Sequence, residues 1–484
     1  MSCIRKSANR LETKFSPPGK PFLIKHKFIL SGRIKLGGDK SIAHRALILS
    51  ALSSGKTILK NFPVHDDSLA TLNALSALGV KILRKEGLVS VKGCGGQGLV
   101  ASLQPIYVNN SGTTLRLLLG VLAGMDFKTK IVAGKYLSLR PMSRVNVPLR
   151  LMGARITAII KDNEEYAPIV ISGGNLKGII YQAKIASAQV KSAILLAGLF
   201  AKGKTQVLER LSTRDHTERM LKLFGANIIV DNKSITLNPN QGLVSPGEIY
   251  IPGDISSAAF FIVLAAIIPK AKIVIEHSSL NPSRSGIINV LKRMRAKIKV
   301  VVFKADKLEN NGLPSNRQSH KLVDFEPRGD LTISGSKLKG TVVYPSEIPS
   351  LVDELPILMV AACFAQGRTI IKGVGELRVK ETDRINSMVV NLRKMGADIQ
   401  VNKVGRVENI VIQGQGRLCG SELKSFGDHR TAMSMVVAAF AAEGESRLDD
   451  ISCVSKSFPG FLKILKSLES RGRFSFFKRT VPWI

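Results

Sequence analysis

Two kinds of hydrophobic segment alternate along the chain, and together they predict a repeated arrangement of helices and strands. The first kind is rich in alanine, apolar on nearly every side and ends in glycine or proline, which is typical of a buried helix. A β-type run follows each copy and predicts a strand. The six copies of this segment span residues 41–55, 112–124, 187–203, 256–269, 353–367 and 428–444.

The second kind of segment is amphipathic and keeps close to the form L-x-x-L-G-A-x-I, with methionine or phenylalanine as the second apolar residue in some copies. Clear copies span residues 75–82, 149–156, 221–228 and 392–399, a poorer one spans 291–298, and a degenerate one spans 462–469. In the poorer copy Arg295 takes the place of the glycine. Because glycine after a helix is a C-cap signal, each copy predicts the end of a helix and the start of a strand.

The order of these segments predicts six repeated units and therefore an α/β architecture with internal pseudo-symmetry. The ends of the buried helices are roughly 65–80 residues apart, except for one gap of about 100 residues. That gap contains a polar stretch over residues 304–329, which we interpret as an insertion loop.

The composition is that of a globular protein with aliphatic cores, since 44 % of the 484 residues are hydrophobic and only 5 % are aromatic. The longest apolar run, residues 258–268, is too short to span a bilayer, so it predicts a buried helix and no membrane partner. Five cysteines without a CxxC pair and seven histidines without HxxxH-type spacing indicate neither a disulfide framework nor a metal site. Scattered cysteines are typical of a reducing compartment.

The charge balance is unusual, because 71 lysines and arginines outnumber 36 aspartates and glutamates, for a net charge of +35. A nucleic-acid-binding protein, an enzyme for polyanionic substrates and a compositional drift toward lysine all fit this excess. The basic residues are spread along the whole chain, which favours drift combined with acidic substrates. Residues 1–28 are basic and lack the apolar core of a secretory signal, so we expect a disordered leader, with an organelle-targeting segment as the alternative.

Polar residues, mostly cationic or small, stand at the start of every predicted buried helix. They are Asp39, Lys40 and Ser41; Asn110, Ser111, Gly112 and Thr113; Ser187, Ala188 and Gln189; Asp254 and Ser256; Asp353 and Glu354; and Asp428, His429 and Arg430. Each group fits plain helix capping. If the six units pack symmetrically, however, several helix N-termini can converge, and their free N–H groups and positive dipole ends form a site for phosphate and other anions.

Four basic residues lie in or within two turns of these helix starts and would add full positive charges: Lys40, Arg45, Arg116 and Arg430. The residues therefore predict a binding site for more than one anionic group. A nucleotide is not indicated, because the chain has neither a Walker A loop nor a GxGxxG motif followed by an acidic residue. The segment VKETDR at 379–384 is, taken alone, typical of a solvated helix start.

Ten motifs occur in order along the chain: GDKSIAHRAL, NNSGTTLRL, LRPM, SAQVKSAILLAGL, TRDHTERML, GDISSAAFF, DELP, VKETDR, GDHRTAMS and SKSFPGF. Over residues 29–470 they resemble the family of 5-enolpyruvylshikimate-3-phosphate synthases, also called 3-phosphoshikimate 1-carboxyvinyltransferases, of the bacterial monofunctional type. GDKSxxHR, VKETDR and DHR together are highly specific for this family. The chain departs from it at Gly37, where a proline is usual, and in the tail at 471–484, which has no counterpart.

The resemblance implies a two-domain inside-out α/β barrel, the enolpyruvyl transferase fold, with six βαβαββ-like units, three per domain. That number agrees with the six units counted in the sequence. One domain is expected to be discontinuous and to comprise residues 29–38 and 253–470, and residues 39–252 are expected to form the other. Closure of the two domains about a hinge near Gly38 and Pro252 would exclude water from the site between them.

The family's reaction transfers the enolpyruvyl group of phosphoenolpyruvate to the 5-hydroxyl of shikimate 3-phosphate and releases phosphate, on the pathway to chorismate and the aromatic amino acids. The resemblance implies that no metal or organic cofactor takes part. We expect a monomeric, cytoplasmic enzyme whose partners are these two small molecules, without a specific nucleic-acid partner.

The family's ligands are carried over to this chain residue by residue. For shikimate 3-phosphate the resemblance implies Lys40, Ser41, Arg45, Ser187, Ala188, Gln189, Arg214, Asp353 and Lys380. For phosphoenolpyruvate it implies Lys40, Asn110, Gly112, Arg140, Gln189, Arg384, Arg430 and Lys456.

The resemblance also implies which residues move protons. Asp353 is the expected general base that takes the proton of the attacking hydroxyl. Glu381, together with Lys40, is expected to give a proton to the methylene carbon and to remove one later. Because these roles need opposite protonation states, the environments of Asp353 and Glu381 should separate their pKa values.

Two other functions are weighed against this one. The related UDP-N-acetylglucosamine enolpyruvyl transferase shares the fold and the donor, but it carries a reactive cysteine in a loop that corresponds to residues 135–140, where KYLSLR has none. A basic RNA-binding protein would need a patch of aromatic residues for base stacking, and the chain has one tryptophan and six tyrosines. Both alternatives fit the sequence less well.

Overall fold

The computed structural model describes residues 22–24, 29–96, 98–239, 242–303, 325–405 and 407–470. Within these ranges, all six predicted buried helices form. They are α1 (Lys40–Leu52), α3 (Gly112–Leu122), α5 (Ala188–Gly198), α7 (Ile255–Ile267), α9 (Leu355–Cys363) and α11 (His429–Ala441). Nearly every residue along them is buried, as their all-round apolar sequences require.

The amphipathic segments form the second helix of each unit. These helices are α2 (Asp66–Ala77), α4 (Ser143–Leu151), α6 (His216–Leu223), α8 (Gly286–Arg293), α10 (Arg384–Lys394) and α12 (Phe461–Ser467). The turn after α2 contains Gly79 with a φ of 90°, in the left-handed region that favours glycine. Arg295, which replaces this glycine in the turn after α8, has a φ of 68°. The turn is therefore kept even where the glycine is lost.

Four sheets of the described chain share one strand order, in which a short strand pairs parallel with a central strand and an antiparallel hairpin follows. They are β16 (Glu248–Tyr250)–β4 (Lys56–Lys60)–β6 (Leu88–Lys92)–β5 (Lys81–Lys85), β7 (Ile106–Tyr107)–β8 (Lys128–Val132)–β10 (Glu164–Ser172)–β9 (Arg155–Lys161), β11 (Ile180–Gln182)–β12 (Thr205–Leu208)–β14 (Ser234–Leu237)–β13 (Ile228–Asp231), and β20 (Val342–Val343)–β21 (Gln366–Lys372)–β23 (Val407–Gln415)–β22 (Asp398–Val404). This repetition is the pseudo-symmetry that the sequence predicts.

A fifth sheet keeps the same order and carries one additional strand. It runs β18 (Lys297–Val302)–β19 (Arg328–Ser334)–β17 (Lys272–Ser279)–β2 (Ile29–Lys35)–β26 (Glu469–Ser470). The other elements are the sheet β1 (Phe22–Ile24)–β25 (Ser446–Leu448)–β24 (Glu422–Leu423), the pair β15 (Leu243–Val244)–β3 (Ser53–Ser54), and the 3₁₀ helices η1 (Ile348–Ser350), η2 (Gly375–Val379) and η3 (Ser452–Lys456).

Strand β1 corrects the expectation that residues 1–28 form a leader without structure. It pairs antiparallel with β25, and Ile24 is buried in the hydrophobic core that surrounds α7 and α11. Phe22 packs against the same core. The apolar side chains of this short strand explain why it is held although the residues before it are basic.

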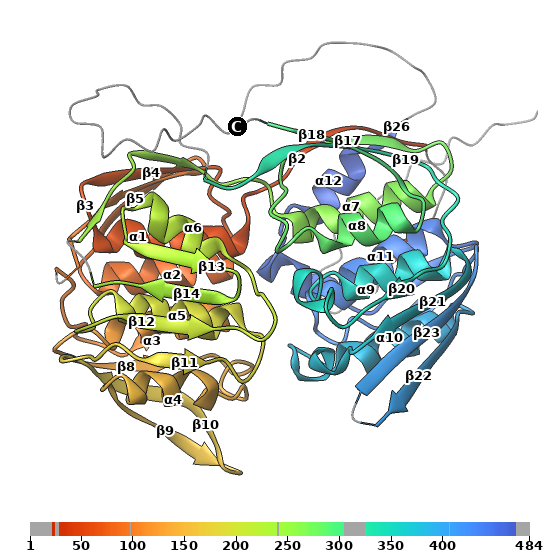
Figure 1. Cartoon of the computed structure of the whole chain (residues 1–484). Coiled ribbons are helices and arrows are strands. Elements are labelled where there is room, and N and C mark those ends of the chain that lie inside the picture. The colour runs from red at the N-terminus through yellow and green to blue at the C-terminus, as the bar shows by residue number, and fades with distance from the viewer. Residues whose placement is uncertain are drawn as a thin grey trace, which may run out of the picture.

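The chain crosses twice between two halves that lie side by side in Figure 1. Strand β2 precedes α1 in sequence, yet it pairs with β17 in the C-terminal half, whereas β16 precedes α7 and pairs with β4 in the N-terminal half. The crossing segments are hydrogen-bonded to each other, since Asp39 N donates to the Pro252 carbonyl at 2.8 Å. Asp254 N likewise donates to the Gly37 carbonyl at 3.0 Å. A Cβ at Gly38 would lie 2.3 Å from a backbone carbonyl oxygen, so this crossing needs glycine.

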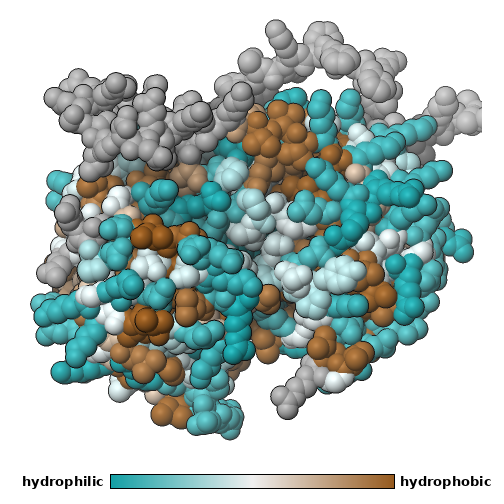
Figure 2. Space-filling model, in the orientation of Figure 1, coloured by the Kyte–Doolittle hydropathy of each residue, from teal (hydrophilic) through white to brown (hydrophobic). Residues whose placement is uncertain are grey.

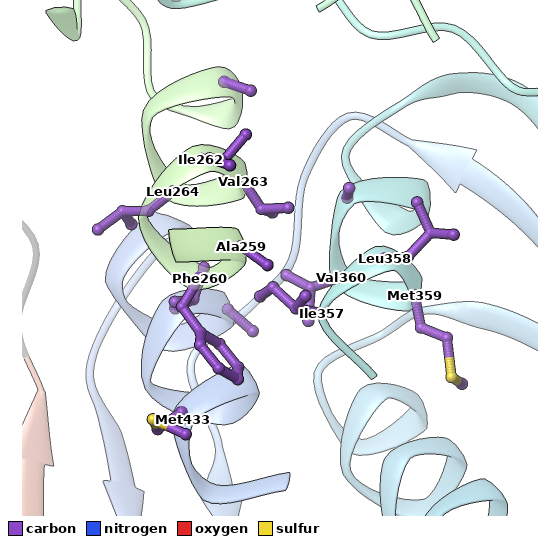
Figure 3. Packing of buried hydrophobic residues seen from close by; sticks show 14 of the residues in the cluster. Ala259, Phe260, Ile262, Val263, Leu264, Ile357, Leu358, Met359, Val360 and Met433 are labelled. Carbon is purple, nitrogen blue, oxygen red and sulfur yellow. The ribbon is translucent and has the colours of Figure 1, made fainter. Parts of the chain in front are cut away.

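Each half has its own hydrophobic core. One core contains buried residues between positions 42 and 251, and the other contains residues from 24 to 36 and from 255 to 468. In the second core, Figure 3 shows Ala259 and Val263 of α7 facing the side chains of α9. On this basis we propose that residues 39–252 and residues 29–38 with 253–470 are the two domains.

The expected insertion loop at 304–329 lies only partly within the described chain. Residues 304–324, like the tail at 471–484, fall outside it. Phe325 is buried in the core of the N-terminal half, although its neighbours in sequence belong to the C-terminal half. Strand β19 begins at Arg328, before the expected end of the loop, because Arg328 and Gly329 pair with β17.

The surface is mostly hydrophilic on the face in Figure 2, and apolar residues form separate patches on it. Exposed apolar side chains include Ile159 and Ile160 of β9 and Ile229 and Val230 of β13, which are edge strands of their sheets. No helix within the described ranges is long and apolar enough to cross a lipid bilayer.

Candidate active site

A pocket between the two halves brings the starts of the six buried helices together. The predicted site residues that line it are Lys40, Ser41, Arg45, Asn110, Gly112, Arg140, Ser187, Ala188, Gln189, Arg214, Asp353, Lys380, Glu381, Arg384 and Arg430. The predicted convergence of helix N-termini is therefore confirmed. Lys456 is the last residue of η3, and its side chain lies outside the described part of the chain.

Most of the residues directly before these helices act as N-caps. A side-chain oxygen accepts a hydrogen bond from a backbone N–H of the first turn in Asp39, Ser111, Ser187, Asp254 and Asp428. For these residues the capping interpretation is correct. Helix α9 differs, because it begins two residues after Asp353, whose carboxylate accepts a hydrogen bond from Arg214. Asp353 therefore faces the pocket and not the helix.

The start of α1 is held by polar contacts within the N-terminal half. Lys40 Nζ donates to Asp67 Oδ2 of α2 at 2.8 Å. Burial lowers the pKa of Lys40, but Asp67 outweighs burial and raises it, so the ammonium stays charged. Arg45 is buried and donates to Thr217 Oγ1 at 2.6 Å and to Ser192 Oγ at 2.8 Å. Burial lowers the pKa of Arg45 to about 10. The guanidinium lines the pocket, and its Nε and Nη2 donate to Thr217 and Ser192.

Gly112, Arg116 and Gln189 form a second group in the N-terminal half. Arg116 Nη1 donates to Gln189 Oε1 at 2.6 Å, which fixes the Gln189 amide at the start of α5. A Cβ at Gly112 would lie 2.8 Å from Arg116 Nη1 and 3.3 Å from Arg140 Nη1, so the glycine makes room for two guanidinium groups. Burial lowers the pKa of Arg116 to about 9, and Arg140 and Arg144 add to this effect.

Two further predicted residues hold their neighbours in place. Asn110 Oδ1 accepts a hydrogen bond from the Tyr136 N–H at 3.0 Å and so fixes the turn that precedes Arg140. In the C-terminal half, Lys380 Nζ donates to Glu376 Oε1 at 2.6 Å. The first contact holds the turn that leads to Arg140, and the second holds the Lys380 side chain itself. Arg140 and Lys380 both line the pocket.

Asp353 lies among arginines that come from both halves. Its carboxylate accepts a hydrogen bond from Arg214 of the N-terminal half and lies 3.7 Å from Arg384 Nη1 and from Arg430 Nη2. Burial raises the pKa of the Asp353 carboxyl, but Arg430 and Arg214 outweigh burial and hold the pKa well below its usual range. Asp353 is therefore ionised, as a general base must be.

Glu381 also faces arginines, although its side chain is 41 % exposed. Arg384 Nη2 donates to its carboxylate, and Arg140 Nη1 from the other half lies 3.7 Å away. Loss of solvent in the pocket raises the pKa of the Glu381 carboxyl, but Arg384 and Arg140 lower it well below its usual range. This differs from the expected separation of the Asp353 and Glu381 pKa values, because guanidinium groups lower both.

Arg384, which is 1 % exposed, connects α10 to the start of α11. Its Nε donates to Asp428 Oδ2 at 2.9 Å, and Asp428 Oδ1 caps α11. Burial lowers the pKa of Arg384, but Asp428 and Glu381 raise it by more, so the charge is permanent. Burial also lowers the pKa of His429 to about 4, so this pocket residue is neutral at pH 7.

The pocket also contains residues to which the family resemblance assigned no ligand. They include Asp67, Thr113, Arg116, Arg144, Arg284, Glu376 and His429. Thr113 and His429 stand in the predicted helix starts, and Arg116 is among the charges near them, so a signal existed for these three. Asp67 lies in the first turn of α2 and Arg284 in the loop after β17, where no such signal exists. Among the described residues, no cluster of three or more histidine, cysteine, aspartate or glutamate side chains could hold a metal ion.

Comparison with known proteins places the chain in one family. Residues 24–465 match the family model of EPSP synthase (3-phosphoshikimate 1-carboxyvinyltransferase). The chain is 44 % identical over 439 residues to the 3-phosphoshikimate 1-carboxyvinyltransferase of Bacillus cytotoxicus, which covers 91 % of this chain and 98 % of the relative. That of Geobacillus thermodenitrificans is 44 % identical, with 91 % and 96 % covered. The solved EPSP synthase of Acinetobacter baumannii has a TM-score of 0.79 and 38 % identity, covering 93 % of this chain and 98 % of that one.

Proposed function

The chain belongs to the EPSP synthase (3-phosphoshikimate 1-carboxyvinyltransferase) family, and we propose that it transfers the enolpyruvyl group of phosphoenolpyruvate to the 5-hydroxyl of shikimate 3-phosphate with release of phosphate. The observation that carries the proposal is the meeting of six helix N-termini and several arginines around two carboxylates, Asp353 and Glu381. Such a site neutralises two substrates that each bear a phosphate and a carboxylate, and it keeps acid–base groups beside them.

Both substrates would take ligands from both halves, but the charged groups at the two ends of the pocket differ. Ser41, Arg45 and the start of α5 in the N-terminal half would hold shikimate 3-phosphate. Arg384 and Arg430 of the C-terminal half would hold phosphoenolpyruvate, together with Arg140 from the facing half. Charge-assisted hydrogen bonds of this kind are strong and directional, so they would keep the attacking hydroxyl and the enol carbon in register.

Two proton transfers accompany the group transfer. Asp353 would accept the proton of the 5-hydroxyl while that oxygen bonds to the C2 carbon of phosphoenolpyruvate. Glu381 or Lys40 would deliver a proton to the methylene carbon, so the tetrahedral adduct carries a methyl group. One proton then leaves the methyl group, the C–O bond to phosphate breaks, and the enolpyruvyl ether and inorganic phosphate form.

Binding of the anionic substrates would also change the basicity of the two carboxylates. The substrate phosphates and carboxylates would engage Arg214, Arg384 and Arg430, which are among the groups that lower the pKa values of Asp353 and Glu381. Sharing these cations weakens their effect on the two carboxyls. Both pKa values would then rise toward the range in which a carboxyl group both takes and gives protons.

The test is phosphate release by the purified protein supplied with phosphoenolpyruvate and shikimate 3-phosphate, with UDP-N-acetylglucosamine as the control acceptor. Release that depends on shikimate 3-phosphate is the expected result. Release with the sugar nucleotide alone would assign the chain to the related transferase, which shares the donor. No release with either acceptor would sink the proposal.

We further propose that the enzyme acts as a monomer in the cytoplasm. The two halves of the chain both contribute residues to the pocket, and Cys94, Cys363 and Cys419 are free thiols, as expected in a reducing compartment. Sedimentation velocity at the protein concentration of the assay would distinguish a monomer from a dimer, and a dimer that persists on dilution would contradict the first part.

A further inference from the structure

Arg284 lies at the point where the two halves are joined. It belongs to the loop between β17 and α8, is 3 % exposed and lines the pocket. Its guanidinium lies 3.6 Å from Asp39 and 3.4 Å from Asp254, the capping residues that follow the two chain crossings. One buried arginine thus balances carboxylates from both crossings.

Hydrogen bonds extend from Arg284 to the starts of three buried helices. Its Nη1 donates to Ser41 Oγ of α1 at 3.3 Å, and its Nη2 donates to Ser256 Oγ of α7. Ser256 Oγ in turn donates to Glu354, which stands between Asp353 and the first residue of α9. Arg284 therefore contacts the start of α1 directly and is connected through Ser256 and Glu354 to the start of α9, beside the proposed base Asp353.

The direction of the bond to Ser41 decides what this hydroxyl can do. A guanidinium can only donate, so Ser41 Oγ accepts from Arg284 and its own proton stays available for donation. The Ser41 carbonyl accepts a hydrogen bond from Arg45 Nη1 at 2.8 Å, which holds the residue from its backbone side. Both Ser41 oxygens accept hydrogen bonds, and the hydroxyl proton is left for a partner in the pocket that Ser41 lines.

We propose that Arg284 is a positioning residue that donates to Ser41, so that the Ser41 hydroxyl donates its own proton to an anionic oxygen of shikimate 3-phosphate. Through Ser256 and Glu354, Arg284 also connects Ser41 to the start of α9. This role rests on the proposed function, since it concerns the same acceptor. The proton that Ser41 donates stays on its oxygen, and no covalent step passes through Arg284.

A double-mutant cycle on the full-length protein tests this role. In the wild-type chain, Ser41→Ala should weaken shikimate 3-phosphate binding about tenfold in isothermal titration calorimetry, because a donor to an anion is lost. In the Arg284→Lys background the buried positive charge remains, but an ammonium cannot fork to Ser41 and Ser256 as a guanidinium does. Ser41→Ala should then weaken binding by less than about threefold.

Two more backgrounds complete the experiment. Arg393→Lys is the matched control, because Arg393 also donates to its surroundings, the Ile399 carbonyl at 2.8 Å, but is not part of the pocket lining. There Ser41→Ala should still weaken binding about tenfold. Arg284→Met keeps the length of the side chain without any donor, and the effect of Ser41→Ala should be reduced as in Arg284→Lys.

The outcomes separate this role from the proposed function. If the wild-type protein binds shikimate 3-phosphate and Ser41→Ala has the same effect in every background, the role of Arg284 is wrong and the proposed function stands. If the wild-type protein does not bind shikimate 3-phosphate, both fail together. A reduced effect in the two Arg284 variants, with the full effect kept in the Arg393 variant, is the result that supports the role.

Discussion

The N-terminal and C-terminal halves are built from the same repeated unit, yet they present different chemistry to the shared pocket. In the N-terminal half, Lys40 and Arg45 are held by polar neighbours outside the proposed reaction, as Asp67 holds Lys40. Arg140 and Arg214 of this half, by contrast, lie against Glu381 and Asp353 across the pocket. In the C-terminal half, the cation Arg384 lies against Asp353 and Glu381, the carboxylates that the proposed reaction uses. The repeated scaffold supplies helix N-termini to both halves, and the first residues of each helix decide what a half can do.

Two aspartates that precede buried helices of the C-terminal half, Asp428 and Asp353, have different roles. Asp428 caps α11 with one carboxylate oxygen and binds Arg384 with the other. Asp353 stands two residues before α9 and pairs with Arg214 across the pocket. A carboxylate that does not cap its helix is available to accept a proton, so the position of the helix start separates a structural aspartate from a reactive one.

Removal of the proposed base Asp353 should have the largest effect on turnover. If it had none, the C-terminal half would not supply the reacting carboxylate. Asp353→Asn keeps the size of the side chain but cannot accept the hydroxyl proton, so kcat should fall by about 10³-fold while shikimate 3-phosphate still binds. Phosphate release and calorimetric titration measure the two quantities. Asp398→Asn, at an exposed position of β22 in the same half, is the control and should keep wild-type turnover. Near-normal turnover in Asp353→Asn would show that Asp353 is not the general base.

Arg430 should distinguish the two substrates. It is buried, lines the pocket and donates to the Asp353 carbonyl at 2.8 Å. Arg430→Ala should weaken phosphoenolpyruvate binding about a hundredfold, because a buried charged donor is lost, and should affect shikimate 3-phosphate far less. KM values for both substrates check this, with the exposed Arg447→Ala as control. An equal loss for both substrates would contradict the assignment of Arg430 to phosphoenolpyruvate.

Much of this architecture could be predicted from the sequence, because helices that are apolar on every side must be buried and their starts carry capping residues. Which helix starts carry capping residues and which carry reactive residues could not be predicted from the sequence. Asp353 and Asp428 both precede a buried helix, and only the residue at which each helix begins distinguishes them. In the segment VKETDR, Asp383 is a cap as its position suggests, whereas Glu381 and Arg384 turn into the pocket.

Contacts between distant segments were also outside the reach of sequence patterns. Lys40 pairs with Asp67, 27 positions away, and Arg284 reaches Ser41 from the other half. No periodicity links such pairs, because they arise only when the units pack. Strand β1 was missed for a related reason, since a strand of three residues depends on its partner β25 for its hydrogen bonds.

The substitution Gly112→Ala would test whether the N-terminal half contributes to phosphoenolpyruvate binding. The added Cβ would lie 2.8 Å from Arg116 Nη1 and 3.3 Å from Arg140 Nη1, so a guanidinium must move. Gly112→Ala should raise the KM for phosphoenolpyruvate about tenfold, since overpacking commonly costs about 1–3 kcal/mol. The KM for shikimate 3-phosphate should change little. Gly375→Ala is the matched control in the other half, because its Cβ would meet no described atom within 4 Å.

The last expected effect is on stability and not on activity, and it concerns the two helices that follow the chain crossings. His44 lies on α1 after the cap Asp39, and Ala259 stands at the same distance from the cap Asp254 on α7. The N-terminal half therefore buries an ionisable ring where the C-terminal half buries a methyl group. His44 Nδ1 shares a hydrogen bond of 2.6 Å with Thr71 Oγ1, and burial lowers the pKa of His44 to about 3 from an ordinary value of 6.5.

Between about pH 6.5 and pH 3 the unfolded chain binds a proton at His44 that the folded chain does not, so stability should fall as the pH falls, by up to about 1.4 kcal/mol per pH unit. In urea unfolding between about pH 6.5 and pH 5, His44→Asn should remove this part of the slope. Thr71→Val keeps the ring and should lower stability without flattening the slope. If the slope of His44→Asn were unchanged, the acid sensitivity would come from other groups, such as His65 and His429, whose pKa values burial lowers to about 4. The buried His44 ring in α1 would then make the fold no more sensitive to acid than the Ala259 methyl group does in α7.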